Sequence, residues 1–169
     1  RGVQLLLYPC AALMLLSGLG AFAWHCQQQG CGRDYPWKTE LPVLGAALTV
    51  HGAALLMPVI QDKIIIMGFG YSGSLIVWMM LFIYFAGSFF YPLRGVQLLL
   101  YPCAALMLLS GLVFPGKFSG YEITDLPFML HIGTSLLAYG LFGIATLLSV
   151  LTLLLNRSYA GLGLSLIHI

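Results

Sequence analysis

The sequence predicts an all-α fold, a polytopic transmembrane helical bundle, and its composition is the first reason. Of the 169 residues, 60% are hydrophobic and only 7% are charged. A soluble domain carries about 25% charged residues, because its surface must be solvated. These proportions exclude a soluble enzyme and a nucleic-acid-binding module, and a net charge of +2 is too small to imply an anionic partner. We therefore expect membrane lipid, and no nucleic acid, around this chain.

The position of the charges is the second reason, because they lie at the ends of long apolar runs or between them. A helix of roughly 20 residues crosses the hydrocarbon core. No run alternates as a barrel strand does, and a backbone in lipid must satisfy its own hydrogen bonds, so the runs are helices. About five spans follow: Gly2 to Trp24, Pro42 to Ile60, Ser74 to Tyr91, Gly95 to Pro115 and Phe128 to Leu155.

The connections between these spans carry the acidic residues, which are Asp34, Glu40, Asp62, Glu122 and Asp125. No carboxylate is then left inside a span for a proton relay. The basic residues lie four on one face of the membrane and three on the other. The positive-inside rule then places loops 61–73 and 116–127 outside the cytoplasm.

An internal repeat divides the chain into three parts. Residues 1–19 recur without change at 94–112. Functional repeats normally survive as weak similarity, and these two copies would have to cross the membrane in opposite directions. We interpret 1–24 as a duplicated span whose residues 1–19 stem from a cloning, assembly or gene-prediction error, 25–157 as a partial membrane domain, and 158–169 as a non-native tail.

Two histidines are the candidates for chemistry inside the spans. His51 lies at the midpoint of the second span, and His131 lies about one turn inside the fifth. Ionisable residues within a membrane are costly and often functional, and a neutral imidazole binds metals. Two histidines on separate spans can be the axial ligands of a haem iron. The alternative is that each neutral imidazole bonds a facing Ser, Thr or carbonyl and only helps the helices to pack.

Other side chains near these histidines fit either interpretation. Ser135 and Tyr139 follow His131 at steps of four residues, so their hydroxyls share its helix face and can serve a ligand. Trp78 lies within the third span. We favour core packing for it over a face for a bound ring, because aromatic residues dominate membrane cores.

Three segments carry a resemblance to a known family. They are PWKTELPVLGAALTVHGAALL around His51, YSGSLIVWMMLFIYF around Trp78 and LPFMLHIGTSLLAYGLFGIATLLSVL around His131. Together they resemble the cytochrome c assembly (CcsA-like) family of the bacterial inner membrane, in particular its YpjD/HemX-type members. The strongest match is the third segment, in which Ser follows His by four residues and Tyr follows Ser by four.

The resemblance implies a multi-pass protein of the bacterial inner (cytoplasmic) membrane that handles haem b during cytochrome c maturation, beside other maturation proteins. His51 and His131 would ligate the haem iron, and Trp78, Ser135 and Tyr139 would be pocket residues. The tryptophan-rich WWD signature of the haem-attaching synthase is absent, so we expect no haem-attachment activity. The alternatives are a small-solute transporter, which Gly140 and Gly143 would suit, and a purely structural membrane subunit.

Overall fold

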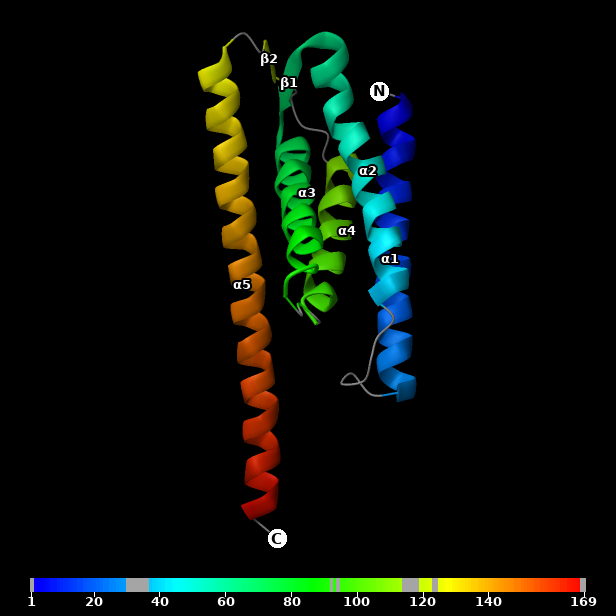
Figure 1. Ribbon diagram of the computed structural model, residues 1–169, viewed down its shortest axis with the longest axis vertical. Coiled ribbons are helices and arrows are strands. Elements are labelled where there is room, and N and C mark those ends of the chain that lie inside the picture. The colour runs from blue at the N-terminus through cyan, green and yellow to red at the C-terminus, as the bar shows by residue number, and fades with distance from the viewer. Residues whose placement is uncertain are drawn as a thin grey trace.

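In the part of the chain that the structure describes, five helices form a bundle with two short strands at one end (Figure 1). The structure is a computed structural model that describes residues 2–29, 37–91, 93, 95–113, 119–122 and 125–167. Its elements are α1 (Gly2–Gln29), α2 (Trp37–Asp62), β1 (Ile64–Met67), α3 (Phe69–Gly87), α4 (Gln97–Val113), β2 (Ser119–Glu122) and α5 (Leu126–Ile167). The predicted helical membrane bundle is confirmed.

Four helices in the described part of the chain are long and apolar enough to cross a membrane: α1, α2, α3 and α5. The remaining predicted span corresponds to α4, whose apolar part, Gln97–Ser110, is shorter. With 17 residues, α4 is about 26 Å long at 1.5 Å per residue. It therefore falls slightly short of a hydrocarbon core of about 30 Å.

Several helix boundaries differ from the prediction: α1 continues to Gln29, and α3 begins at Phe69 rather than Ser74. Asp62, which was predicted in a loop, is the last residue of α2. α2 begins at Trp37, before the expected start at Pro42, so Glu40 lies in its first turn and the prediction of a loop position was wrong. A carboxylate in the first turn stabilises a helix, because the N-terminal end of the helix dipole is positive. α5 continues past the expected end at Leu155 to Ile167, since no proline follows Pro127 to stop it.

The two strands join the connections at one end of the bundle. β1 pairs antiparallel with β2, in a register that sets Ile64 opposite Glu122 and Met67 opposite Ser119. Lys63 takes a left-handed conformation, with φ 53°, at the turn between α2 and β1. The sequence predicted only unstructured connections here. The pairing ties the start of α3 to the segment before α5 (Figure 1).

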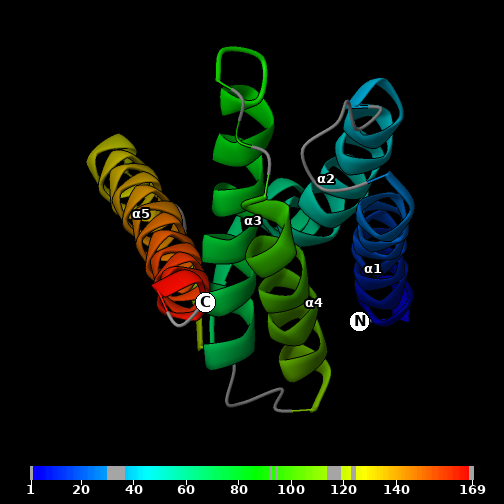
Figure 2. The same cartoon turned by 90° about the horizontal axis from the view of Figure 1, so that it is seen from below.

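The helices run alternately down and up, with α3 between α5 on one side and α2 and α4 on the other (Figure 2). α5 packs mainly on α3, through a flat stretch around Gly140 and Gly143. A Cβ atom at Gly140 would lie 2.8 Å from Cγ of Met79, and one at Gly143 would lie 2.7 Å from Sδ of Met80. Small residues of this kind let helix backbones approach closely in membranes. The two glycines thus have a packing role against α3.

The repeated sequence forms the first part of α1 and nearly all of α4, and these helices pack against each other in opposite directions (Figure 1). Both copies bury the same face. In α1 this face is Ala11, Ala12 and Leu15, and in α4 it is the equivalent Ala104, Ala105 and Leu108. The interface therefore places like residues on both sides, and small alanines allow the close approach.

Candidate functional site

The histidine of the second span lies in a row of polar contacts that joins α2 to α3. Three side chains of α3, spaced so that they share one helix face, each reach one position of α2. The three pairs are Tyr71 with the carbonyl of Leu55, Ser74 with His51, and Trp78 with the carbonyl of Leu48. We call these three contacts the α2–α3 ladder. Because the two helices are antiparallel, the residue numbers of successive contacts increase along α3 and decrease along α2.

His51 is the central member of the α2–α3 ladder and is almost completely enclosed. It is 1% exposed, and its Nε2 lies 2.8 Å from Oγ of Ser74, which is 2% exposed. A hydrogen bond between two buried side chains on neighbouring spans is the arrangement expected of an imidazole that helps helices pack. The structure therefore gives His51 the kind of partner that the packing alternative requires.

Trp78 also lies within the α2–α3 contact. Its Nε1 donates to the carbonyl oxygen of Leu48 at 2.9 Å, and its ring stacks on Phe82 with centroids 5.8 Å apart. The indole lies directly over Gly52, where a Cβ atom would come within 2.9 Å of Nε1. The side chain is thus a packing residue in this arrangement, and Gly52 makes the space for it.

The fifth helix presents its candidate residues differently. His131 is exposed, Ser135 is half-buried and Tyr139 is 61% exposed. No hydrogen bond of the His131 imidazole is found among the described residues; the bond from Thr134 goes to the His131 carbonyl. An imidazole in this position is open to any ligand or protein that covers α5.

The structure does not bring the two histidines together. In the described part of the chain α2 and α5 make no contact, and α3 lies between them (Figure 2). His51 points into the α2–α3 contact, whereas His131 lies on an exposed face of α5. The five candidate residues therefore form two groups, His51 with Trp78 and His131 with Ser135 and Tyr139.

The two groups fit a haem differently. The surroundings of His51 do not fit one, because Nε2 is bonded to Ser74 and the Trp78 indole fills the space over Gly52. An iron ligand at this position would require α2 and α3 to separate. His131 lies on an open helix face, where it could ligate a haem iron without any helix moving, and two hydroxyl groups lie further along the same helix.

Other metal sites find no support in the described residues. Among them no group of three or more His, Cys, Asp or Glu side chains is placed to hold a metal ion. Cys26 is disulfide-bonded, so its sulfur is not a free thiolate ligand.

A second polar cluster, which the sequence did not predict, joins α2, α3 and α4. The Tyr101 hydroxyl donates to Oε1 of Glu40, and the Tyr84 hydroxyl donates to Oε1 of Gln97 at 2.6 Å. The two tyrosine rings meet edge to face, with centroids 6.1 Å apart. Gln97 is 1% exposed, and its Nε2 has no hydrogen-bond partner in the described structure. Glu40 was missed because its helix begins earlier than predicted.

These features define the class of the protein as a multi-pass helical membrane protein with a buried polar contact and an exposed intramembrane histidine. Residues 41–165 match the family described as cytochrome C assembly protein. This match covers most of the chain, from the first turns of α2 nearly to the end of α5, and includes both histidines. The chain therefore belongs to the cytochrome c assembly family, and its role lies in cytochrome c biogenesis. No curated protein and no solved structure matches the chain.

Proposed function

We propose that this protein is a haem-handling member of the cytochrome c assembly family, of the YpjD/HemX type, in the bacterial inner membrane. One observation carries the proposal: the family match includes an apolar helix that holds an exposed imidazole, His131. A polar ring facing hydrocarbon is costly unless a ligand or another protein covers it. A haem offers both an iron for the imidazole and an apolar ring for the surrounding helix face.

In this proposal three residues of α5 hold different parts of the haem. His131 would provide a nitrogen ligand to the iron. Ser135 and Tyr139 lie one and two turns further along the helix and offer hydroxyl groups to polar edges of the ligand. The iron would supply ligand exchange and electron transfer when bound, whereas the chain contributes binding and orientation.

His51 has a different part in the proposal. It supports the α2–α3 contact through Ser74 and becomes a ligand only if that contact opens. Handling haem requires binding and release rather than bond formation, so no catalytic residue is assigned. Partners among other cytochrome c maturation proteins would receive or deliver the haem at the exposed face of α5.

The experiment is purification of the protein in detergent from cells supplied with haem, followed by absorption spectroscopy. We expect a Soret band that is lost in His131→Ala and retained in Thr134→Ala, which alters an exposed residue of the same helix. A haem-free protein, or a band that His131→Ala leaves unchanged, would overturn the proposal. Solute uptake that is independent of haem would instead favour a transporter. Unchanged cytochrome c levels after replacing both histidines would favour a structural subunit.

A further inference from the structure

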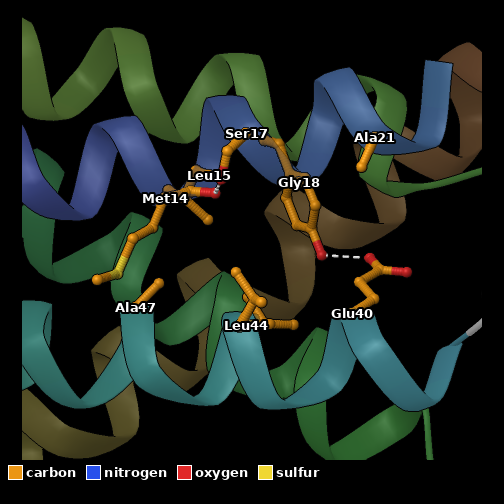
Figure 3. A pocket seen from close by; sticks show the side chains of 10 residues that line it. Met14, Leu15, Ser17, Gly18, Ala21, Glu40, Leu44 and Ala47 are labelled. Carbon is orange, nitrogen blue, oxygen red and sulfur yellow. Dashed lines mark hydrogen bonds between the residues drawn. The ribbon is translucent and has the colours of Figure 1, made fainter. Parts of the chain in front are cut away.

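A cavity lies apart from both histidines, between α1, α2 and the first turns of α4 (Figure 3). Its volume is about 310 Å³, at the lower end of the range for small-molecule sites. Small residues on the facing helices, Gly18, Ala21 and Ala47, leave the space open. Four of the ten lining residues, Met14, Leu15, Ser17 and Gly18, lie in the repeated segment 1–19. The cavity is therefore a property of the chain that contains both copies of the repeat.

Glu40 gives this cavity its chemical character. It is the one charged residue among the ten that line the space, and none of the ten is Lys, Arg or His. Tyr101, which also lines the cavity, donates a hydrogen bond to Oε1 of Glu40, the bond marked by the dashed line at Glu40 in Figure 3. Most of the remaining wall is aliphatic and comes from side chains such as Leu15, Val43 and Leu44.

A carboxylate beside an apolar wall selects among possible ligands. Loss of water makes an unpaired charge costly, so a ligand that brings a positive charge is favoured and an anionic ligand is repelled. An ammonium group adds three hydrogen-bond donors, and a charge-assisted bond is roughly twice as strong as a neutral one. An aliphatic body on the same ligand would fill the rest of the space.

We propose that the cavity between α1, α2 and α4 binds a primary amine that carries an apolar body, with its ammonium group on Glu40. Such a ligand has two sources, a free alkylamine or the ethanolamine headgroup of a membrane lipid. The site contains neither His51 nor His131, so it is independent of the proposed haem handling.

The test uses the full chain in nanodiscs of phosphatidylcholine, which has no primary amine. Binding of n-octylammonium and of n-octanol is measured by saturation-transfer NMR. We expect the ammonium to bind at least about tenfold more tightly than the alcohol, as a charged hydrogen bond implies. In Glu40→Gln the difference should fall to about twofold or less on the same reasoning. Equal ammonium binding by the wild type and Glu40→Gln would overturn the proposal.

A second pair of variants separates the cavity from general partition into the bilayer. Val43→Phe places a larger side chain at the cavity wall, whereas Ala46→Phe alters an exposed position of α2 outside it. We expect Val43→Phe to weaken both ligands and Ala46→Phe to weaken neither. Identical binding by these two variants would contradict the proposal. Nanodiscs with phosphatidylethanolamine identify the source, because competition by that lipid indicates its headgroup and undiminished affinity indicates a free amine.

Discussion

The two intramembrane histidines show how differently one residue type is used in two regions of this molecule. His51 lies between two helices, is 1% exposed and has Ser74 as a hydrogen-bond partner. His131 lies on a helix that is packed along one side only, and it is exposed. The cost of a polar group in a membrane is thus met within the chain at His51, whereas no hydrogen bond of the His131 imidazole is found among the described residues.

The packed face of α5 explains the exposure of His131. Gly140 and Gly143 lie against α3, and the neighbouring Ile144 is buried. At 3.6 residues per turn, His131 lies about 180° around the helix from Gly140. Packing α5 through its glycines therefore turns the imidazole outward. The exposure of His131 follows from the small residues on its helix rather than from its position along the helix.

The largest expected effect comes from changing that packed face. Gly140→Leu would place a side chain where a Cβ atom already lies 2.8 Å from Cγ of Met79 and 3.0 Å from Cδ1 of Ile83. Overpacking of this kind destabilises by about 3 kcal/mol, and we expect α5 to separate from α3. The free energy of unfolding, measured in detergent by titration with SDS, checks this.

Gly133→Leu is the matched control, since nothing lies within 4 Å of a Cβ atom at Gly133. It should change the unfolding free energy by no more than about 0.5 kcal/mol, as surface substitutions do. If both variants were equally destabilised, the close contact between α5 and α3 would be wrong.

A smaller loss of unfolding free energy is expected at the buried histidine, His51. Ser74→Ala removes the partner of a His51 nitrogen that is enclosed by protein. A buried polar group without its partner costs about 2 kcal/mol. His131→Ala, in contrast, should leave the unfolding free energy within about 0.5 kcal/mol of the wild type, because the imidazole is exposed.

The double variant His51→Leu with Ser74→Ala sharpens this prediction. Its loss of stability should be smaller than the sum of the two single losses, because both partners of one hydrogen bond are then removed together. Additive losses of unfolding free energy would mean that the two side chains do not interact. That result would contradict the hydrogen bond at the centre of the α2–α3 ladder.

Where Trp78 covers α2, we expect a substitution to lower the free energy of unfolding by about 1 kcal/mol, the low end of the range for overpacking. Gly52→Ala adds a methyl group 2.9 Å from Nε1 of Trp78, which must shift away from the Leu48 carbonyl. Gly45→Ala is the control, because its nearest neighbour is a ring atom of Phe85 at 3.7 Å. Thermal unfolding followed by tryptophan fluorescence compares them, and a larger loss in Gly45→Ala would contradict the contact.

Much of the fold follows from the sequence. The long apolar runs predicted the helices, and even the exposure of His131 is implicit in the spacing of Gly140 and Gly143. The boundaries were harder. Glu40 was assigned to a loop because charge was taken as the end of a span, whereas a carboxylate in a first turn stabilises the helix it begins.

The candidate site was predictable in part. An intramembrane histidine with a facing serine was one of two expected alternatives, but the choice of Ser74 depends on the antiparallel register of α2 and α3. The same register pairs Tyr71 and Trp78 with backbone carbonyls. Their spacing, with Ser74, on one helix face was the signal available in the sequence. Nothing in the apolar pattern revealed the cavity at Glu40, since it depends on which small residues of α1 and α2 face each other beside Tyr101 of α4.

The smallest effect is expected at the outer end of the α2–α3 ladder. Tyr71→Phe removes a hydroxyl that donates to the Leu55 carbonyl, an oxygen within helix α2. Because a helical carbonyl also has its own backbone donor, its loss of a second donor should cost only about 0.6 kcal/mol, the average for such bonds between membrane helices. Tyr91→Phe, at a residue that is 67% exposed, is the control for removing a hydroxyl. The free energy of unfolding in SDS compares the contacts of the α2–α3 ladder. If Tyr71→Phe lowered it as much as Ser74→Ala does, all bonds of the ladder would contribute alike, and the hydrogen bond to His51 would have no special weight.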